Sequence, residues 1–388
     1  METVPVLYGT LVQALRCHDQ WLDARHLKTL AWMVSGLIQS EKIGLEAWAL
    51  RVHSRARQLA STVRRFRRFL DNERIEVNAL YGPLLSQALL KGVPPTLYVA
   101  LDTSLLWNSY CLGRLSLIYR GRAVPLGWTV LAHGSVSVSF ETYQQLLDQA
   151  APWLFPFPCQ VVLLADRGVA DTELMDYLDT LGWHWRLRIK ESFWVYRAGH
   201  KQRKINSIRL PEGQPQFWQE VQITQQRFGP VYLALGRPFN STQRWVVVSD
   251  QPTRLETFRE YGLRFDMEEG FLDDKSNGFQ LESSQIRSAE ALNRLCLVLA
   301  VATLYLVCQG TQVVQQGKRR WVDAHWFRGH SYLKIGWQWV HRALRYGYAL
   351  LTEFLLSADP DPEPAMASKK QHDERTQPRF IGIASKAA

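Results

Sequence analysis

Apolar residues recur at helical spacing through the first part of the chain. The segment 27–40, LKTLAWMVSGLIQS, shows this spacing. A later set follows at steps of four, three and four residues, which places its members on one face of a helix: Leu59, Val63, Phe66 and Leu70. The period-two alternation that is typical of strands is almost absent here. We therefore predict a separate helical domain over residues 1–92.

The pattern changes after Pro94 and Pro95 to short runs rich in β-branched and aromatic residues. Three of them, TLYVALDTS, LSLIYRGR and AVPLGWTVLAH, predict an antiparallel meander joined by glycine-containing turns. A helical pattern follows over Phe140–Ala150. The next run, CQVVLLADRG, is apolar and ends in an acid, which indicates a strand buried on both faces whose end meets solvent.

Later elements are predicted in the same way. We expect a helix over Asp171–Leu181 and then a strand at HWRLRI. The following stretch is rich in Gly, Pro and Gln, so we expect an inserted β-rich module over 191–250 that ends with the strand RWVVVSD. Helical spacing resumes at Leu255 and continues to about Leu356. The final segment, 357–388, is polar and proline-rich, a composition that predicts disorder.

The net charge of the chain indicates the kind of partner that it binds. Lys and Arg total 46 against 36 Asp and Glu, so the chain of 388 residues has a net charge of +10 and favours a polyanion such as nucleic acid. The segment 51–70 holds seven arginines and no acid. Arg57, Arg64 and Arg68 fall opposite the apolar helix face. We expect this face to bind DNA phosphates, with an ordinary solvated surface as the alternative.

A membrane is not expected as a partner. The longest charge-free apolar run, Leu295–Cys308, is shorter than the roughly 20 residues of a membrane-spanning helix, so we interpret it as a buried core helix. The N-terminal sequence METVPVLYGT lacks the features of a secretory signal. Five scattered cysteines match neither a disulfide framework nor a zinc-ligand spacing. We therefore expect a cytoplasmic location.

Two carboxylates stand at the ends of apolar strands. Asp102 lies in ALDTS and Asp166 ends VVLLAD. Burying a lone carboxylate costs several kcal/mol unless a cation or a hydrogen-bond donor compensates it. Each acid alone could be structural and paired with an arginine, and Arg167 is the nearest partner for Asp166. Two such strands also bring carboxylates to one edge of a sheet, which favours a shared metal site.

A third set of chemical groups lies at helical spacing. Its members are separated by three, four and seven residues: Tyr261, Arg264, Glu268 and Lys275. At about 100° per residue, they fall within an arc of about 60° on a continuous helix. The neighbouring acids, Glu269 and Asp266, project elsewhere. One carboxylate among an Arg, a Lys and a phenol suits a metal ligand beside phosphates, although an i, i+4 salt bridge between Arg264 and Glu268 is the simpler alternative.

These motifs together resemble the DDE transposases of bacterial insertion sequences, in the IS-four-type branch. The segment Y261-GL-R264-FDM-E268-EGFLDD-K275 matches that branch's Y-R-E-K signature at every interval. YVALD102T resembles the first acid of the family, and LLAD166RGVAD171 resembles its second block. A Trp precedes the signature in relatives, as Trp245 does here. The resemblance covers about residues 95–350 and covers the N-terminal domain loosely.

The resemblance implies a fold and a chemistry. The fold is α/β, with a ribonuclease H-like core in two parts, 93–190 and 251–356, around the β-rich insertion at 191–250. The N-terminal helical domain would bind DNA, and the second part of the core would end in C-terminal helices. Asp102, Asp166 and Glu268 would hold two Mg²⁺ ions, for which Mn²⁺ can substitute, and would activate the attacking oxygen. Arg264, Lys275 and Tyr261 would hold phosphates, and Trp245 would stack on an unstacked base.

The function implied is that of a transposase that binds the terminal inverted repeats of its element. It would pair the two ends as a homodimer, cut them and join them to target DNA, in the cytoplasm and close to the nucleoid. A transposase-derived protein that binds these ends without cutting them is the main alternative. A glycosidase with two carboxylates is another, but it leaves the basic helix and the Tyr, Arg and Lys set unexplained.

Overall fold

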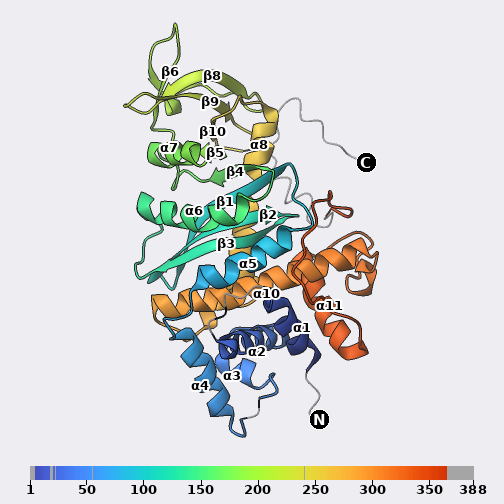
Figure 1. Ribbon diagram of the computed structural model, residues 1–388. Helices are drawn as coiled ribbons and strands as arrows, with labels where there is room; N and C mark the ends of the chain where they lie inside the picture. The colour runs from blue at the N-terminus through green and yellow to red at the C-terminus, as the bar shows by residue number, and fades with distance from the viewer. Residues whose placement is uncertain (1–4, 18–20, 22, 55, 240, 365–388) are drawn as a thin grey trace.

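A ten-stranded sheet runs through the molecule in the order β3-β2-β1-β4-β5-β10-β9-β8-β6-β7. The computed structural model describes residues 5–17, 21, 23–54, 56–239 and 241–364. Figure 1 shows the strands β6, β8 and β9 at one end of the molecule and the helices α1–α4 at the other, beyond the long helix α10.

The first five strands in the chain form one half of the sheet: β1 (Thr96–Leu106), β2 (Tyr110–Tyr119), β3 (Arg122–Leu131), β4 (Gln160–Ala165) and β5 (His184–Arg188). β1, β2 and β3 form the predicted antiparallel meander, and β4 pairs in parallel with both β1 and β5. This mixed order is consistent with the ribonuclease H-like core that the sequence resemblance implies. The prediction of glycine in both turns was wrong, because Trp107 and Asn108 turn the first hairpin with φ of 51° and 54°.

The segment expected to form an inserted module continues the same sheet. Its strands are β6 (Trp194–Tyr196), β7 (Arg203–Lys204), β8 (Gln216–Ile223), β9 (Phe228–Gly236) and β10 (Trp245–Ser249). β10 pairs antiparallel with β5, with Val247 opposite Arg188. The backbone groups along the outer side of β5 are thereby satisfied by strands from the same chain, which avoids an exposed edge next to the core.

Helices cover both faces of the sheet. On one face, α6 (Phe140–Leu154) contacts β2 and β3, and α7 (Thr172–Thr180) contacts β5. On the other, α9 (Phe265–Leu272) contacts β1, β2 and β3, and α10 (Ala289–Gln315) contacts β3. α8 (Leu255–Gly262) packs against β5, β9 and β10. α9 is therefore held directly on the strands that carry Asp102 and its neighbours.

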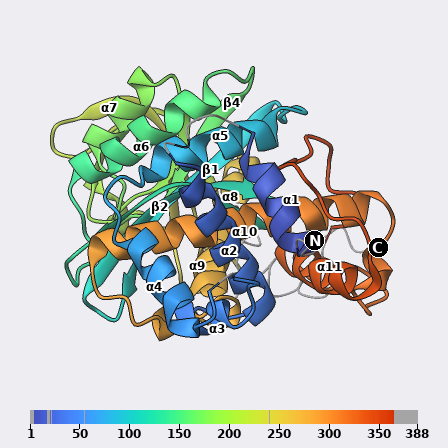
Figure 2. The same ribbon diagram turned by 60° about the horizontal axis from the view of Figure 1, so that its bottom comes forward.

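The five N-terminal helices are α1 (Val6–Leu15), α2 (Ala24–Ser40), α3 (Leu45–Ala49), α4 (Leu59–Leu70) and α5 (Val77–Leu89). α2, α4 and α5 pack onto α10, whereas α1 and α3 pack against α2, so these helices do not form the separate domain that we expected. One hydrophobic cluster runs from Leu7 to Leu356 and includes residues of both regions. The physical reason is that α10 is apolar over nearly its whole circumference, so it offers the amphipathic N-terminal helices a surface to bury against. Figure 2 shows α2 and α4 beside α10.

α10 is the core helix predicted from Leu295–Cys308. Within the described residues, it is the one helix long and apolar enough to cross a membrane, and 83% of its most apolar window is buried inside the structure. α11 (Tyr332–Tyr346) crosses it closely. A Cβ on Gly310 of α10 would lie 2.0 Å from the carbonyl oxygen of Tyr332, and one on Gly336 would lie 1.8 Å from that of Leu306. The two helices can approach this closely because both positions lack a side chain.

The helical pattern predicted from Leu255 onward is broken into pieces. α8 and α9 are followed by a π-helical turn, Asp273–Asn277, and by a 3-10 turn, Leu281–Ser283. Between α10 and α11 lies a loop that contains one more 3-10 turn, Arg319–Trp321. Of the tail predicted to be disordered, residues 365–388 lie outside the described residues. The described part pairs with the core: Asp361 with Arg328, and Glu363 with Arg319.

Candidate active site

Asp102 and Asp166 meet at one edge of the β1–β4 pair. Leu101 is the register partner of Ala165 in this parallel ladder, and each acid is the next residue of its chain. Buried apolar residues precede both acids, so each strand is fixed on both faces up to the point where its carboxylate begins. Both acids are only partly buried. The two carboxylates therefore converge as predicted, but Asp102 lies within β1, which continues to Leu106, and not at the end of its strand.

Asp102 is held by two donors. Its Oδ1 accepts from the backbone N–H of Thr103 at 2.8 Å, and its Oδ2 accepts from Arg264 Nη1 at 2.9 Å. Burial raises the pKa of Asp102, Arg264 and the Thr103 amide lower it, and the nearby charges of Asp166 and Glu268 raise it. The net direction is upward. Three carboxylates from three separate segments thus lie close enough to influence one another's charge.

Arg264 joins two of these carboxylates. While Nη1 donates to Asp102, Nη2 donates to Glu268 Oε1 at 2.9 Å. The Arg264 side chain is 5% exposed, and that of Glu268 is 50% exposed. Burial lowers the pKa of Arg264, but Tyr261, Asp102, Asp166 and Glu268 raise it, and the net shift is upward. The i, i+4 salt bridge considered as the simpler alternative does form, and the same guanidinium also binds the strand acid.

The helix that carries the signature is not continuous. α8 ends at Gly262, and Arg264 stands before α9 with its N–H donating to the carbonyl of Tyr261, three residues back. Arg264 and Glu268 remain close enough across this turn to form their ion pair. The prediction that Glu269 and Asp266 project elsewhere agrees with their positions: both lie near Arg122 of β3. Burial raises the pKa of Asp266 to about 7.

Tyr261 contacts the second aspartate. Its hydroxyl donates to Asp166 Oδ1 at 3.4 Å, and burial raises the pKa of the phenol. In contrast, Arg167 is exposed, and no ion pair between the described residues joins it to Asp166. Asp171, the last residue of the second block, caps α7 by accepting from the N–H of Leu174 at 2.9 Å. The phenol, and not the adjacent arginine, is the partner of Asp166.

Trp245 packs against the ring of Tyr261. It does not present a ring face to DNA, contrary to our expectation that it would stack on an unstacked base. It is 3% exposed. Its ring contacts those of Tyr261, at 5.4 Å between centroids, and of Phe258 and Phe265, at 6.2 and 5.9 Å. These residues belong to a small hydrophobic cluster beneath α8, separate from the main core. A ring enclosed in this way has no free face on which a base could stack.

Lys275 reaches the same strand at a different point. It lies in the π-helical turn after α9, and its Nζ donates to Ser104 Oγ at 2.7 Å and to the carbonyl of Leu105. Ser104 is two residues beyond Asp102, and side chains two apart share a face of a strand. Burial lowers the pKa of Lys275. Because the helix ends at Leu272, the four signature residues do not form the single helical stripe that their spacing predicted.

A buried ion pair that we did not predict anchors the far end of α9. Arg114 of β2 is the register partner of Asp102, and its guanidinium pairs with Asp274 in the π-helical turn. It also lies 4.3 Å from the centre of the Phe271 ring. Both charged side chains are almost fully buried. The sequence did contain a signal, because Arg114 is a lone charge in an apolar strand, the same criterion that selected Asp102.

The arginines expected to bind DNA lie apart from these carboxylates. Arg64 and Arg68 are exposed on α4, and Arg57 is exposed just before it. Among the described residues, no ion pair involves any of the three. The apolar face is smaller than predicted, because Leu59 is 41% exposed while Phe66 and Leu70 are buried. Figure 1 shows α4 on the opposite side of α10 from the sheet.

Comparison with known families decides between classes of protein. A family model described as the transposase DDE domain matches residues 109–305, just over half of the chain. The chain belongs to the DDE transposase family. The match includes Asp166, Glu268 and the rest of the signature, whereas Asp102 lies before it on β1. No match was found among curated proteins.

DDE transposases are DNA-acting enzymes of the nuclease type that use divalent metal ions, and the donor set here fits such ions. All three candidate ligands are carboxylates, the hard oxygen donors that Mg²⁺ and Mn²⁺ prefer. The buried guanidinium of Arg264 between two of them indicates that the cluster requires compensating positive charge. The tertiary structure thus brings together all the carboxylates that the sequence nominated.

Proposed function

We propose that this chain is a cut-and-paste transposase whose active site consists of Asp102, Asp166 and Glu268. It would bind the terminal inverted repeats of its insertion sequence, cleave them and transfer the freed ends to target DNA. The observation that carries the proposal is the meeting of three acids from β1, β4 and α9 around Arg264. The resemblance of Tyr261, Arg264, Glu268 and Lys275 to the Y-R-E-K signature supports the IS-four-type branch.

The three carboxylates would hold two Mg²⁺ ions, or Mn²⁺ in their place. Bound ions of this kind supply Lewis-acid activation of the attacking oxygen and stabilisation of the leaving one. The side chains around them orient the carboxylates. Arg264 fixes Asp102 and Glu268 relative to each other, and the Tyr261 hydroxyl fixes Asp166. Lys275, beside Ser104, extends the positive charge along β1, where a DNA phosphate would lie next to the cleaved bond.

Duplex binding would use a different part of the molecule. Arg57, Arg64 and Arg68 form an exposed row without ion pairs among the described residues, which suits the phosphates of the inverted repeats. We propose that two copies of the chain pair the ends as a homodimer and act on DNA in the cytoplasm, close to the nucleoid. In this proposal, the α4 arginines bind duplex DNA, and the carboxylate site cleaves it.

The second candidate is a derived protein that binds these ends without cutting them. It would use the same α4 surface, so DNA binding alone does not distinguish the two. The complete carboxylate set with its Arg264 bridge favours the active enzyme. A glycosidase is not supported, because the family match covers the segment that holds two of the three acids.

The test incubates purified protein with duplex DNA taken from both sides of its coding sequence, with and without Mg²⁺. We expect metal-dependent strand cleavage at the element's ends, and its loss in Asp102→Ala and Glu268→Gln. Glu269→Gln is the matched control, because that neighbouring carboxylate faces Arg122 instead of the other acids. Full cleavage by Asp102→Ala would refute the proposed triad. Binding without cleavage in Mg²⁺ and Mn²⁺ would favour the derived protein.

A further inference from the structure

Large aromatic side chains are exposed on the loop between α10 and α11 and at the end of α11. Trp326 is 81% exposed, Tyr346 is 54% exposed and Trp321 is 46% exposed. Trp321 contacts the Trp339 and Tyr348 rings at 6.1 and 5.6 Å between centroids. Exposed indole rings are unfavourable in water, and a group of them marks a surface that another molecule covers. We call this group the aromatic surface.

Cations lie over these rings. Arg320 is 4.4 Å from the centre of the Trp326 ring. Other basic side chains lie over the remaining rings of the aromatic surface at 5.1 to 5.9 Å: Lys318 over Trp321, Arg342 over Trp321 and Tyr346, and Arg345 over Tyr346. Such cation–π contacts hold each positive charge next to a ring face. A ligand on this surface would therefore meet a flat apolar face and a positive charge side by side.

Acidic residues are sparse along this part of the chain, and the next one after it, Glu353, is exposed. Between residues 316 and 352 the sequence contains one acidic residue, Asp323, and its side chain is fully buried. Arg319 and Arg328 are buried and paired with acids of the 357–364 segment. In the described part of the chain, no ion pair involves the four cations of the aromatic surface: Lys318, Arg320, Arg342 and Arg345. The complementary partner is a polyanion.

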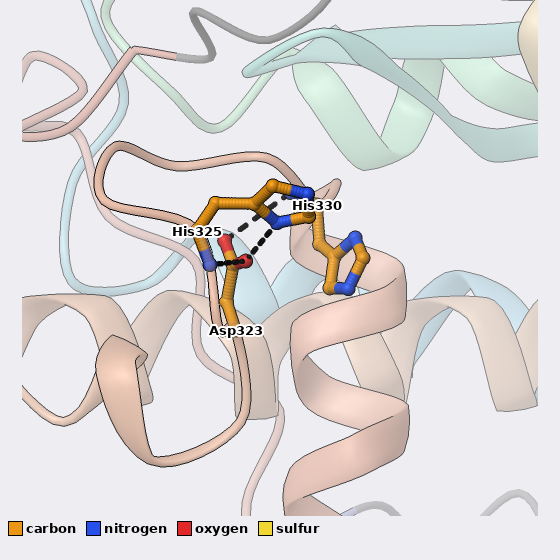
Figure 3. A group of neighbouring side chains, drawn as sticks. All are labelled: Asp323, His325 and His330. Atoms are coloured by element: carbon orange, nitrogen blue, oxygen red, sulfur yellow. Dashed lines mark hydrogen bonds and ion pairs between the residues drawn. The ribbon is translucent and has the colours of Figure 1, made fainter.

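The loop that presents Trp326 is fixed from inside. Figure 3 shows Asp323 beneath His325 and His330. Asp323 Oδ2 accepts from the N–H groups of Gly329 at 2.8 Å and His330 at 3.3 Å, and Oδ1 accepts from that of His325 at 3.1 Å. The potential ligand atoms of the three residues lie within 4.8 Å of one another. Both carboxylate oxygens of Asp323 already accept hydrogen bonds from these donors and from Arg319. The cluster therefore holds the loop in its conformation and does not suit a metal ion.

We propose that the aromatic surface binds single-stranded DNA, with bases stacked on the exposed rings and phosphates on the adjacent cations. This inference rests on the proposed function in one respect: DNA cleavage by the transposase would produce ends with unpaired bases, which this surface would bind. In a duplex the base faces are hidden within the stack, so Trp326 would find no partner there. Contact between two copies of this surface would place cations against cations, which disfavours self-association. The surface shares no residue with the carboxylate site or with α4.

The experiment measures fluorescence anisotropy of a labelled oligothymidine of about 20 nucleotides, longer than one stacking site, and of a duplex of equal length. It is performed in EDTA with the full chain, where cleavage cannot occur, so failure here is distinct from failure of the proposed enzyme. Trp326→Ala should weaken single-strand binding about five- to hundredfold. Trp326→Phe should retain most of it, since a ring face remains. The double change Arg320→Gln with Arg345→Gln should lower the salt slope by about 1.4.

The matched control is Arg209→Gln with Arg259→Gln, which removes two exposed charges outside the aromatic surface, α4 and the carboxylate site and should leave single-strand binding unchanged. Thermal unfolding of Trp326→Ala should match the parent, because the side chain is mostly in solvent. Unaltered single-strand affinity in Trp326→Ala would overturn the proposal. An equal loss of affinity for duplex and for single-stranded DNA in Trp326→Ala would also overturn it. A variant that changed the oligomeric mass of the protein but not its affinity for DNA would overturn it as well.

Discussion

Arg114 lies directly opposite Asp102 in the β1–β2 ladder, and the two side chains hold the same helix at its two ends. Asp102 binds Arg264, which precedes α9, and Arg114 pairs with Asp274, which follows it. Glu268 stands between these two anchors. Its position relative to β1 is therefore determined by two ion pairs that reach the helix from adjacent strands.

The first prediction concerns the buried anchor. Arg114→Met should destabilise the protein by about 3 to 5 kcal/mol, because it leaves the Asp274 carboxylate buried without a partner. Urea denaturation measures this change. Replacing both partners together, Arg114→Met with Asp274→Leu, should recover most of the stability, since no charge is then left unpaired. A double variant as unstable as the single one would contradict this account.

The second prediction concerns Arg264. Arg264→Lys keeps the charge but cannot donate in parallel to Asp102 and Glu268, so the two carboxylates lose their fixed spacing. We expect DNA cleavage to fall about ten- to hundredfold, the effect of small misplacements at an active site. Affinity for duplex DNA in EDTA should change little. Arg259→Lys, at an exposed position of α8, is the control and should cleave normally.

The third prediction separates two roles for Trp245. As a packing residue beneath Tyr261, it should cost about 3 to 5 kcal/mol of folding free energy when changed to Ala. Trp245→Phe should cost less. A base-stacking role would give the opposite result: weaker DNA binding with unchanged stability. Parallel measurements of chemical denaturation and duplex affinity on both variants distinguish these outcomes.

The fourth prediction concerns pH and Asp323. Burial alone would raise its pKa, but hydrogen bonds from His325 and from the loop N–H groups lower it to about 2, from an ordinary value of 3.8. The stability contributed by the charged form is thus complete above about pH 4 and is lost as the pH falls toward 2. Asp323→Asn should be less stable by about 2 to 3 kcal/mol at neutral pH. Thermal unfolding between pH 7 and pH 2 should show this difference shrinking in acid; a constant difference would contradict the assignment.

The sequence by itself determined the elements and most of the candidate site. Apolar runs that end in Asp102 and Asp166 predicted two strands with acids at one edge, and the parallel register of β1 and β4 brings the two acids side by side although β1 continues to Leu106. Helical intervals selected Glu268 over its acidic neighbours, because spacing of four residues fixes direction within one turn. Net charge and the arginines of α4 indicated a polyanionic partner. All of these inferences depend on local geometry or composition.

Tertiary structure decided the contacts between distant segments. Arg264 reaches Asp102 across 162 residues of chain, and Arg114 reaches Asp274 across 160. The helix break before α9 and the π-helical turn after it allow these pairings, and they redirect Lys275 to Ser104. Burial of Trp245 and the shared packing of the N-terminal helices on α10 also depend on which surfaces meet. Periodicity shows that a residue has a buried side, but only the packed chain shows what lies against it.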